Sequence, residues 1–333
     1  MFWLFYSPAL LTPLFALKDR NYAFLYAFPI MAIWMLLSLF RPYYGNDLIG
    51  YFEFFSGERF FSFSEVIYPL LLVSESKTIN AHIFFAYCFA GSALGYWICA
   101  KKLNIDYLKF FLLYCVGFLV VREFASTRAG AMAPFLFLTV FEKKRSRKLI
   151  YYFLASSFHF AAFFMAPIAL LVNSFLYKKS SRTIALGAFM GVSTICSLVA
   201  FPSLLEFLIY KVRHYSTLGH LTDGLNLIFV LAMFKKVGFI VLLFLLLQHK
   251  DYPYQRFLFF TLFLSFLLPL LGRLSGHNGV ERLGSVLDVS ELFLLLLAMK
   301  CTSGASQLIL GFVGLVYFCP TPFLIWLNYS GNY

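Results

Sequence analysis

Apolar blocks long enough to cross a bilayer follow one another along nearly the whole chain. A helix needs roughly 20 apolar residues to span the hydrocarbon core, where only helices and closed barrels satisfy their backbone polar groups. The blocks are continuously apolar instead of alternating, which excludes a barrel. They leave room for about ten to twelve helices. The predicted fold class is therefore an all-α polytopic membrane protein, with a single transmembrane domain over residues 1–333.

The distribution of basic residues predicts how these spans are oriented. The spans lie near residues 4–17, 22–40, 79–100, 107–121, 129–141, 149–163, 164–177, 183–201, 227–247, 257–271, 283–299 and 306–327. Lys and Arg are dense in the connections at 18–20, 101–102, 142–148, 177–182 and 248–256, and again at Lys300. The positive-inside rule assigns these connections to the cytoplasm. The formal net charge of +12 therefore reports orientation and does not indicate a nucleic-acid partner.

The opposite face receives the unusual ionisable residues of the chain. It carries the larger loops 41–78 and 202–226, the turns at 122–128 and near 160–166, and the loop 272–282. Ionisable groups are costly near hydrocarbon, so their gathering at one membrane depth from distant segments usually marks a functional cavity. We therefore expect a cavity that opens on the less basic side of the membrane.

Arg122 and Arg128 stand in the middle of an almost wholly apolar stretch. On one continuous helix, residues with this spacing point about 120° apart and lie about 9 Å apart along the axis. The two guanidinium groups can therefore converge only across a helix break or a cavity. Arginine presents a planar fork of donors that suits phosphate oxygens, which favours a diphosphate clamp. The alternative is an interfacial pair whose side chains reach toward lipid headgroups.

The loop after the second predicted span combines aromatic residues with carboxylates. Gly45 and Asn46 form a turn that would present Asp47, and Tyr51 and Glu53 follow among further Tyr and Phe residues. Aromatic faces with nearby carboxylates hold sugars, because CH groups stack on the rings and hydroxyls find acceptors. The alternative is an aromatic belt at headgroup level beside a solvated turn.

Two histidines and three further arginines complete the candidate residues. His159 is a lone imidazole at a helix end, and it is either a structural residue or a proton acceptor. His214 has Arg213 beside it, which fits an anionic ligand or, equally, an interfacial basic helix. Arg273 and Arg282 flank a Gly-rich turn.

Charged residues also interrupt two of the predicted spans. Asp288 and Glu291 share one helix face, and buried acids of this kind take part in proton or cation relays, which favours a transporter. Lys235 and Lys236 interrupt another span. Either both lysines face a wet cavity, or residues 225–234 lie along the outer interface and the span begins near residue 237. We favour the interfacial interpretation, which adds two cations to the outer cavity.

In their order and spacing, these segments resemble the EpsG-like branch of the O-antigen polymerase (Wzy) superfamily. The similar segments are the loop "YYGNDLIGYFEFF", the stretch from Arg122 through the basic turn 143–148 to Phe158 and His159, and the late "ERLGSVLDVSELFLLLL". The resemblance covers roughly residues 40–175 and 273–300, and residues 201–240 do not align.

The resemblance implies a glycosyltransferase of the GT-C type in the bacterial inner membrane, with its active site facing the periplasm. Such an enzyme joins oligosaccharides that are carried on undecaprenyl diphosphate. It is expected to need no metal and no other cofactor, because cationic side chains can stabilise the departing diphosphate. The expected partners are the lipid-linked oligosaccharide and membrane lipid, with room for a chain-length-regulating membrane protein.

On this interpretation the candidate residues fall into two groups. The expected catalytic residues are Arg122 and Arg128 as the diphosphate clamp and Asp47 or His159 as the base, and the expected substrate-binding residues are Tyr51, Glu53, Arg213, His214, Arg273 and Arg282. A lipid-linked oligosaccharide flippase, a proton-coupled transporter and an O-antigen ligase remain the alternatives. The sequence does not name the sugars or their linkage.

Overall fold

The computed structural model describes residues 76–118, 127–177, 181–200, 227–275, 278–302 and 304–318, and these form helices joined by short turns, with no strand among them. In chain order the helices are α5 (Lys77–Leu103), α6 (Tyr107–Gly117), α7 (Thr127–Phe141), α8 (Arg145–Phe158), α9 (Ala162–Leu176), α10 (Ser181–Ala200), α12 (Leu227–Leu247), α13 (Gln255–Ser275), α14 (Asn278–Leu287), α15 (Val289–Cys301) and α16 (Ala305–Phe318). The predicted spans 4–17 and 22–40, the loop 202–226 and most of the loop 41–78 lie outside these residues.

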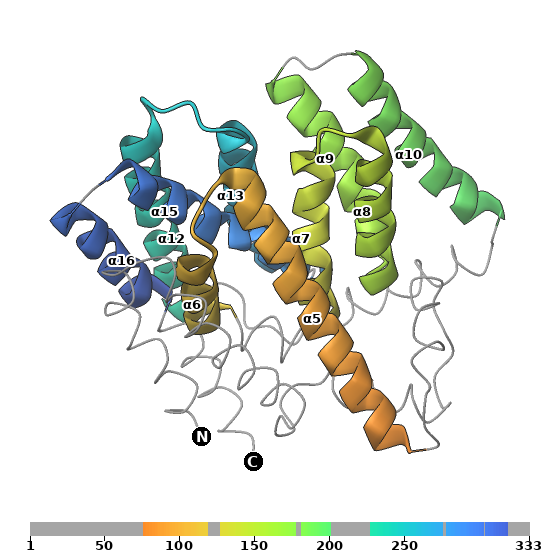
Figure 1. Cartoon of the computed structure of the whole chain (residues 1–333), viewed down its shortest axis with the longest axis horizontal. Coiled ribbons are helices and arrows are strands. Elements are labelled where there is room, and N and C mark those ends of the chain that lie inside the picture. Colours follow the sequence, from red (N-terminus) through yellow and green to blue (C-terminus); the bar gives the residue numbers. More distant parts are fainter. Residues whose placement is uncertain are drawn as a thin grey trace. The chain divides into compact units, whose positions relative to one another are not determined.

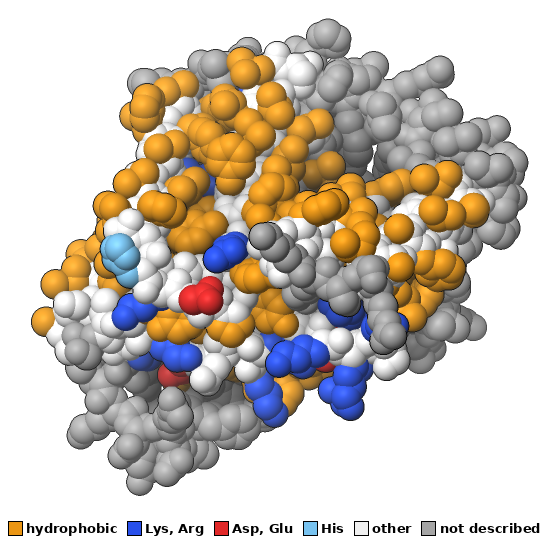
Figure 2. All heavy atoms as spheres, turned by 90° about the horizontal axis from the view of Figure 1, so that it is seen from above, with side chains coloured by type: hydrophobic (Ala, Val, Ile, Leu, Met, Phe, Trp, Pro, Cys, Tyr) orange, Lys and Arg blue, Asp and Glu red, His pale blue; other side chains and the backbone are white. Residues whose placement is uncertain are grey.

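Three of the described helices are long and apolar enough to cross a membrane. They are Ile79–Leu103, Phe229–Leu247 and Gln255–Ser275. Large apolar side chains such as Trp97, Phe175, Phe234 and Phe312 are exposed on the outside of the helices, which suits a lipid surface and not water. Figure 2 looks at the molecule from above the view of Figure 1 and shows hydrophobic side chains over much of this face, with Lys and Arg side chains gathered in one part of it. The chain is therefore a membrane protein, whereas the count of ten to twelve spans stays a prediction.

The chain divides into two compact units. One contains residues 1–160 and 299–333, and among its described parts are α5 to α8 and α16. The other contains residues 161–298, which include α9, α10, α12, α13 and α14 and most of α15. The prediction of a single domain stays a prediction.

In the first unit, α5 and α7 run parallel and pack closely (Figure 1). The residue numbers of their contacts rise together along both helices, from Ser92 with Gly130 through Gly95 with Pro134 to Lys102 with Glu142. The close approach depends on the small residues in "GSALG" (91–95), because a Cβ at Gly95 would lie 2.7 Å from Pro134 Cβ. Small residues spaced by four are the usual means by which membrane helices approach each other.

Helix α8 returns antiparallel to α7. Lys148 near the start of α8 donates to the Thr139 carbonyl near the end of α7, at 3.1 Å. Farther along, the Phe158 ring stacks on Phe135 with 5.6 Å between centroids, and it also fills the space left by Gly91. This pairing brings the end of α8 beside the N-terminal half of α7.

In the second unit, α12 and α13 form a long antiparallel hairpin. Its contacts pair residues whose numbers add to nearly the same sum, Phe229 with Arg273, Lys236 with Ser265 and Phe244 with Phe259. The hairpin turns at residues 248–254, between the two helices. Helix α14 packs against α13, and α9 packs against α10.

Each proline inside a described helix meets the same kind of neighbour. A proline has no N–H, so the carbonyl four residues earlier loses its helical partner. The freed carbonyls of Gly130, Phe163 and Ser265, which belong to the bends at Pro134, Pro167 and Pro269, accept from Ser92 (3.5 Å), Thr194 (3.1 Å) and Lys236 (3.1 Å). The donor always comes from a neighbouring helix, as membrane interiors require.

Three predicted segments differ from the structure. Helix α12 runs without interruption over Leu227–Leu247, so the interfacial interpretation of residues 225–234 is wrong. The predicted span 283–299 is broken at Asp288, between α14 and α15. The predicted span 149–163 ends at Phe158, because His159 takes an extended backbone conformation with φ −153° and ψ 130°.

Candidate functional site

Arg128 and His159 lie at the same end of the α5, α7 and α8 group. Arg128 is the second residue of α7, and His159 directly follows the last residue of α8. The antiparallel pairing of these helices places both positions toward the N-terminal end of α7, although 31 residues separate them in the sequence. Both side chains are half-buried. The packing therefore places a guanidinium and an imidazole at one end of the first unit, where the sequence predicts both.

Most of the other predicted site residues lie outside the described part of the chain. They are Asp47, Tyr51, Glu53, Arg122, Arg213 and His214. Arg282 belongs to α14, but its side chain is also outside the described part. The predicted convergence of Arg122 with Arg128 thus stays a prediction.

Arg273 lies in the last turn of α13, in the second unit. Its guanidinium carbon sits 5.2 Å from the centre of the Phe229 ring on α12, a cation–π distance. Arg273 is therefore at the end of the α12–α13 hairpin that is opposite to the turn at 248–254. The sequence of α14, which follows after two residues, contains Arg282.

The second unit also holds a buried group of charges that the sequence interpretation did not bring together. Lys236 Nζ lies 2.5 Å from Asp288 Oδ1 and 3.0 Å from Glu291 Oε1. The side chains of Lys236 and Glu291 are 9% and 6% exposed, and that of Asp288 is 28% exposed. A charged side chain inside a membrane helix needs a partner of opposite charge, so Lys236 alone already indicates acidic partners in a neighbouring helix. Those partners are Asp288 and Glu291, which the sequence analysis considers as members of a proton or cation relay.

Comparison with known proteins identifies the relationship of the chain. The model of the EpsG family matches residues 23–333, which is nearly the whole chain. The chain belongs to the EpsG family. The match includes residues 201–240, for which the sequence analysis finds no counterpart. No curated protein and no solved structure matches the chain. Membership of the EpsG family associates the chain with polymerase-like glycosyl transfer in polysaccharide biosynthesis.

At the other end of the first unit, this EpsG-family protein presents its basic turn. Residues 143–147 are exposed, and Lys148 is buried with its ammonium against the last carbonyls of α7. The buried Glu142 carboxylate accepts from Lys102 and from the backbone N–H groups of Lys143 and Lys144. Burial alone would raise the pKa of Glu142, but these hydrogen bonds lower it to about 2. The turn is thus fixed in place by a carboxylate that stays ionised.

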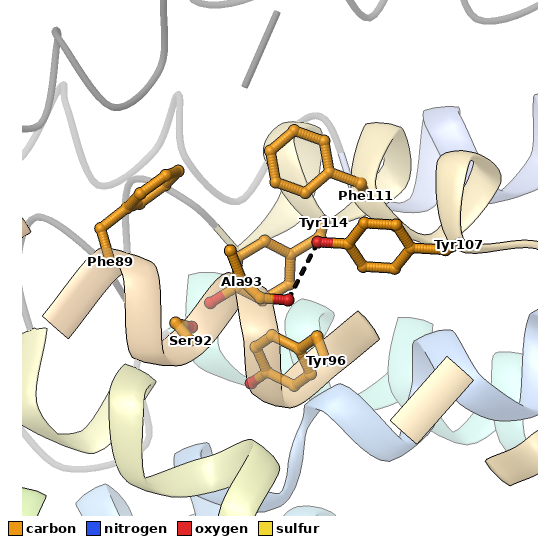
Figure 3. A pocket seen from close by; sticks show the side chains of 7 residues that line it. All are labelled: Phe89, Ser92, Ala93, Tyr96, Tyr107, Phe111 and Tyr114. Carbon is orange, nitrogen blue, oxygen red and sulfur yellow. Dashed lines mark hydrogen bonds between the residues drawn. The ribbon is translucent and has the colours of Figure 1, made fainter. Parts of the chain in front are cut away.

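Aromatic side chains of α5 and α6 line a recess in the first unit (Figure 3). Its lining residues are Phe89, Ser92, Ala93, Tyr96, Tyr107, Phe111 and Tyr114, and the Tyr107 hydroxyl donates to the Ala93 carbonyl at 3.0 Å. The recess has no room for even a water-sized sphere. It is therefore a packing contact between two helices and not a substrate pocket.

Metal ligands do not gather in the described residues. No group of three or more His, Cys, Asp or Glu side chains within them could hold a metal ion. The described cysteines Cys88, Cys99, Cys196 and Cys301 are free thiols. Of the predicted site residues, those whose side chains the structure describes are Arg128, His159 and Arg273.

Proposed function

We propose that this EpsG-family protein is a polysaccharide repeat-unit polymerase of the Wzy type. It transfers a glycan from undecaprenyl diphosphate onto a lipid-linked repeat unit at the periplasmic face of the bacterial inner membrane. The observation that carries the proposal is the family match over residues 23–333. The substrate of such an enzyme joins a long apolar tail to a charged and sugar-bearing head, which suits a site at the end of a helix group.

The proposed reaction is a displacement at the anomeric carbon of the donor sugar. A hydroxyl oxygen of the acceptor sugar forms the new bond to that carbon, while the bond to the diphosphate oxygen breaks and its electron pair leaves with the diphosphate. The hydroxyl proton passes to His159 or Asp47. Negative charge grows on the leaving diphosphate, and preorganised cations lower the barrier because they bind this charge most strongly in the transition state.

The geometry of the first unit supports roles for two residues in this reaction. Arg128 and His159 lie at one end of the unit, so a cation for the diphosphate and an acceptor for the proton are available together. The basic turn at 143–148 lies at the other end. If that turn is cytoplasmic, as the positive-inside rule requires, Arg128 and His159 face the periplasm. No metal is assigned to the mechanism, since the arginines supply the charge.

A substitution of Arg128 tests the proposal in cells that lack the native gene. Arg128→Ala should lower the rate of glycan transfer about 100-fold, the usual effect of removing one preorganised donor, and surface glycan should collapse to single repeat units. Arg128→Lys keeps the charge but not the paired donors, so we expect partial ladders. The matched control is Arg147→Ala, which removes an exposed arginine from the opposite end of the same unit. Normal long ladders from Arg128→Ala at normal protein levels would contradict the proposal.

Deletion of the gene separates the polymerase from its alternatives. Loss of a polymerase leaves single repeat units attached to the cell surface, loss of a flippase leaves none, and loss of a ligase leaves free polymer. The transporter alternative rests on Asp288 and Glu291, and both of these carboxylates are bonded to Lys236 in the structure.

A further inference from the structure

The three proline bends differ in the chemistry of their donors. At the bends of α7 and α9, a neutral hydroxyl from Ser92 or Thr194 meets the freed carbonyl. At the bend of α13, the donor is the Lys236 ammonium. A hydroxyl satisfies one carbonyl without burying a charge, whereas burying an ion pair costs several kcal/mol per ion before its contacts are counted. The use of lysine therefore indicates a task that a hydroxyl cannot perform.

Lysine differs from a hydroxyl in the number of segments that it can hold at once. From the middle of α12, the Lys236 ammonium contacts the Ser265 carbonyl of α13, the Asp288 carboxylate between α14 and α15, and the Glu291 carboxylate in the first turn of α15. The exposed Lys250, in contrast, lies at the turn of the hairpin. One buried ammonium thus ties the bend of α13 to the break between α14 and α15.

Helix α14 also packs directly against the proline bend of α13. A Cβ at Gly284 of α14 would overlap Pro269, lying 2.8 Å from Pro269 Cγ and 3.1 Å from Leu268 Cβ. The Pro269 ring therefore sits against the backbone of α14. The last turn of α13, which carries Arg273, follows directly after the bend at Pro269. Helix α14, whose sequence contains Arg282, directly precedes the break at Asp288.

We propose that Lys236 is a positioning residue for the glycosyl transfer. By holding the α13 bend and the α14–α15 break in one arrangement, Lys236 fixes the last turn of α13 relative to α14, and so the setting of Arg273 toward the diphosphate. The assignment of the diphosphate rests on the proposed function, whereas the fixing of the two helix segments does not. Asp288 and Glu291 are part of the same device, because they compensate the charge and complete the tie.

Hydrogen exchange measured by mass spectrometry on the full chain in lipid nanodiscs tests the positioning. Lys236→Met alone leaves the buried Glu291 and the partly buried Asp288 without their partner and can fail to fold. The decisive variant is therefore Lys236→Met with Asp288→Asn and Glu291→Gln, which removes all three charges. We expect amides of residues 266–275 and 285–291 to exchange roughly tenfold faster, because a charge-assisted contact no longer holds them. Exchange in α5, α7 and α8 should not change. Lys250→Met is the matched control and should leave every segment unchanged.

The same variants give an activity readout that a general loss of stability would not reproduce. With purified enzyme and a lipid-linked repeat unit, the triple variant should lose at least about tenfold in kcat with little change in KM, because misplaced cations act mainly on the transition state. Wild-type exchange in residues 266–275 and 285–291 would overturn the proposal, as would faster exchange spread evenly over the second unit. If the wild-type enzyme makes no polymer, the proposed function fails, and the exchange measurement still decides whether Lys236 positions these segments.

Discussion

Lys102 and Glu142 are 40 residues apart in the sequence, yet Lys102 Nζ lies 2.8 Å from Glu142 Oε2. This ion pair joins the last turn of α5 to the residue that follows α7. The ion pair lies where α5 and α7 end, next to the basic turn at 143–148. It therefore holds the start of that turn against the end of α5.

The ion pair should contribute measurably to stability. Glu142→Gln and Lys102→Met should each lower the free energy of unfolding, and the double variant should lose less than the sum, with a coupling of about 1 kcal/mol. Unfolding of the four proteins in detergent gives this double-mutant cycle. Additive losses would show that the two side chains act independently.

The stability of the protein should fall in acid because of Glu142. Burial alone would raise the pKa of Glu142, but hydrogen bonds from Lys102 and from the Lys144 and Lys143 backbone lower the pKa from its usual 4.5 to about 2. The folded state thus holds the proton less tightly than the unfolded state, so the stabilisation is complete above pH 4.5 and is lost as the pH falls to about 2. The unfolding midpoint, measured against pH, should fall less steeply in Glu142→Gln across this window. Parallel curves for the two proteins would refute the assignment.

The close approach of α5 and α7 depends on Gly95. Gly95→Ala should cost about 1–3 kcal/mol of stability, because the added methyl overlaps the Pro134 ring and both helices are rigid there. Gly238→Ala is the control, since a Cβ at Gly238 of α12 would meet nothing within 4 Å. That variant should be neutral or slightly stabilised. Equal thermal midpoints for the two variants would show that α7 can move away without cost.

The position of α5 could be predicted from the sequence, and the partners of the membrane helices could not. The apolar block at 79–100 predicts α5, because hydrophobic length and the following Lys101 and Lys102 define its end. Lys236 misleads the same logic. A lysine in the middle of a span is acceptable only with a partner, and Asp288 lies 52 residues farther along the chain. Local patterns carry no information on that pairing.

The break at Asp288 shows the same limit for the candidate site. The sequence predicts one helix over residues 283–299, whereas the structure has two, α14 and α15, with Asp288 between them in an ion pair with Lys236. His159 is predicted to lie at a helix end, although the predicted span runs to residue 163 and the helix ends at Phe158. His159 lies toward the same end of the unit as Arg128 because α7 and α8 pack antiparallel. The sequence indicates this packing only through the short basic connection between the two helices.

Pro269 and Lys236 should be energetically coupled. Pro269→Ala restores an N–H that can bond to the Ser265 carbonyl, so the carbonyl no longer depends on Lys236. In this background, the variant that neutralises Lys236, Asp288 and Glu291 should lose less stability than it does with Pro269 present, by about 1 kcal/mol. Unfolding in detergent measures both differences. The same loss in both backgrounds would mean that the contact with Ser265 contributes nothing.

The parallel course of α5 and α7 has a consequence for biogenesis. Two parallel helices cannot be joined by a tight turn, and α6 stands between α5 and α7 in the chain. During synthesis, α5 is therefore made before its partner α7. Until α7 is inserted, the Ser92 hydroxyl and the glycines of "GSALG" lack their contacts with Gly130 and Pro134.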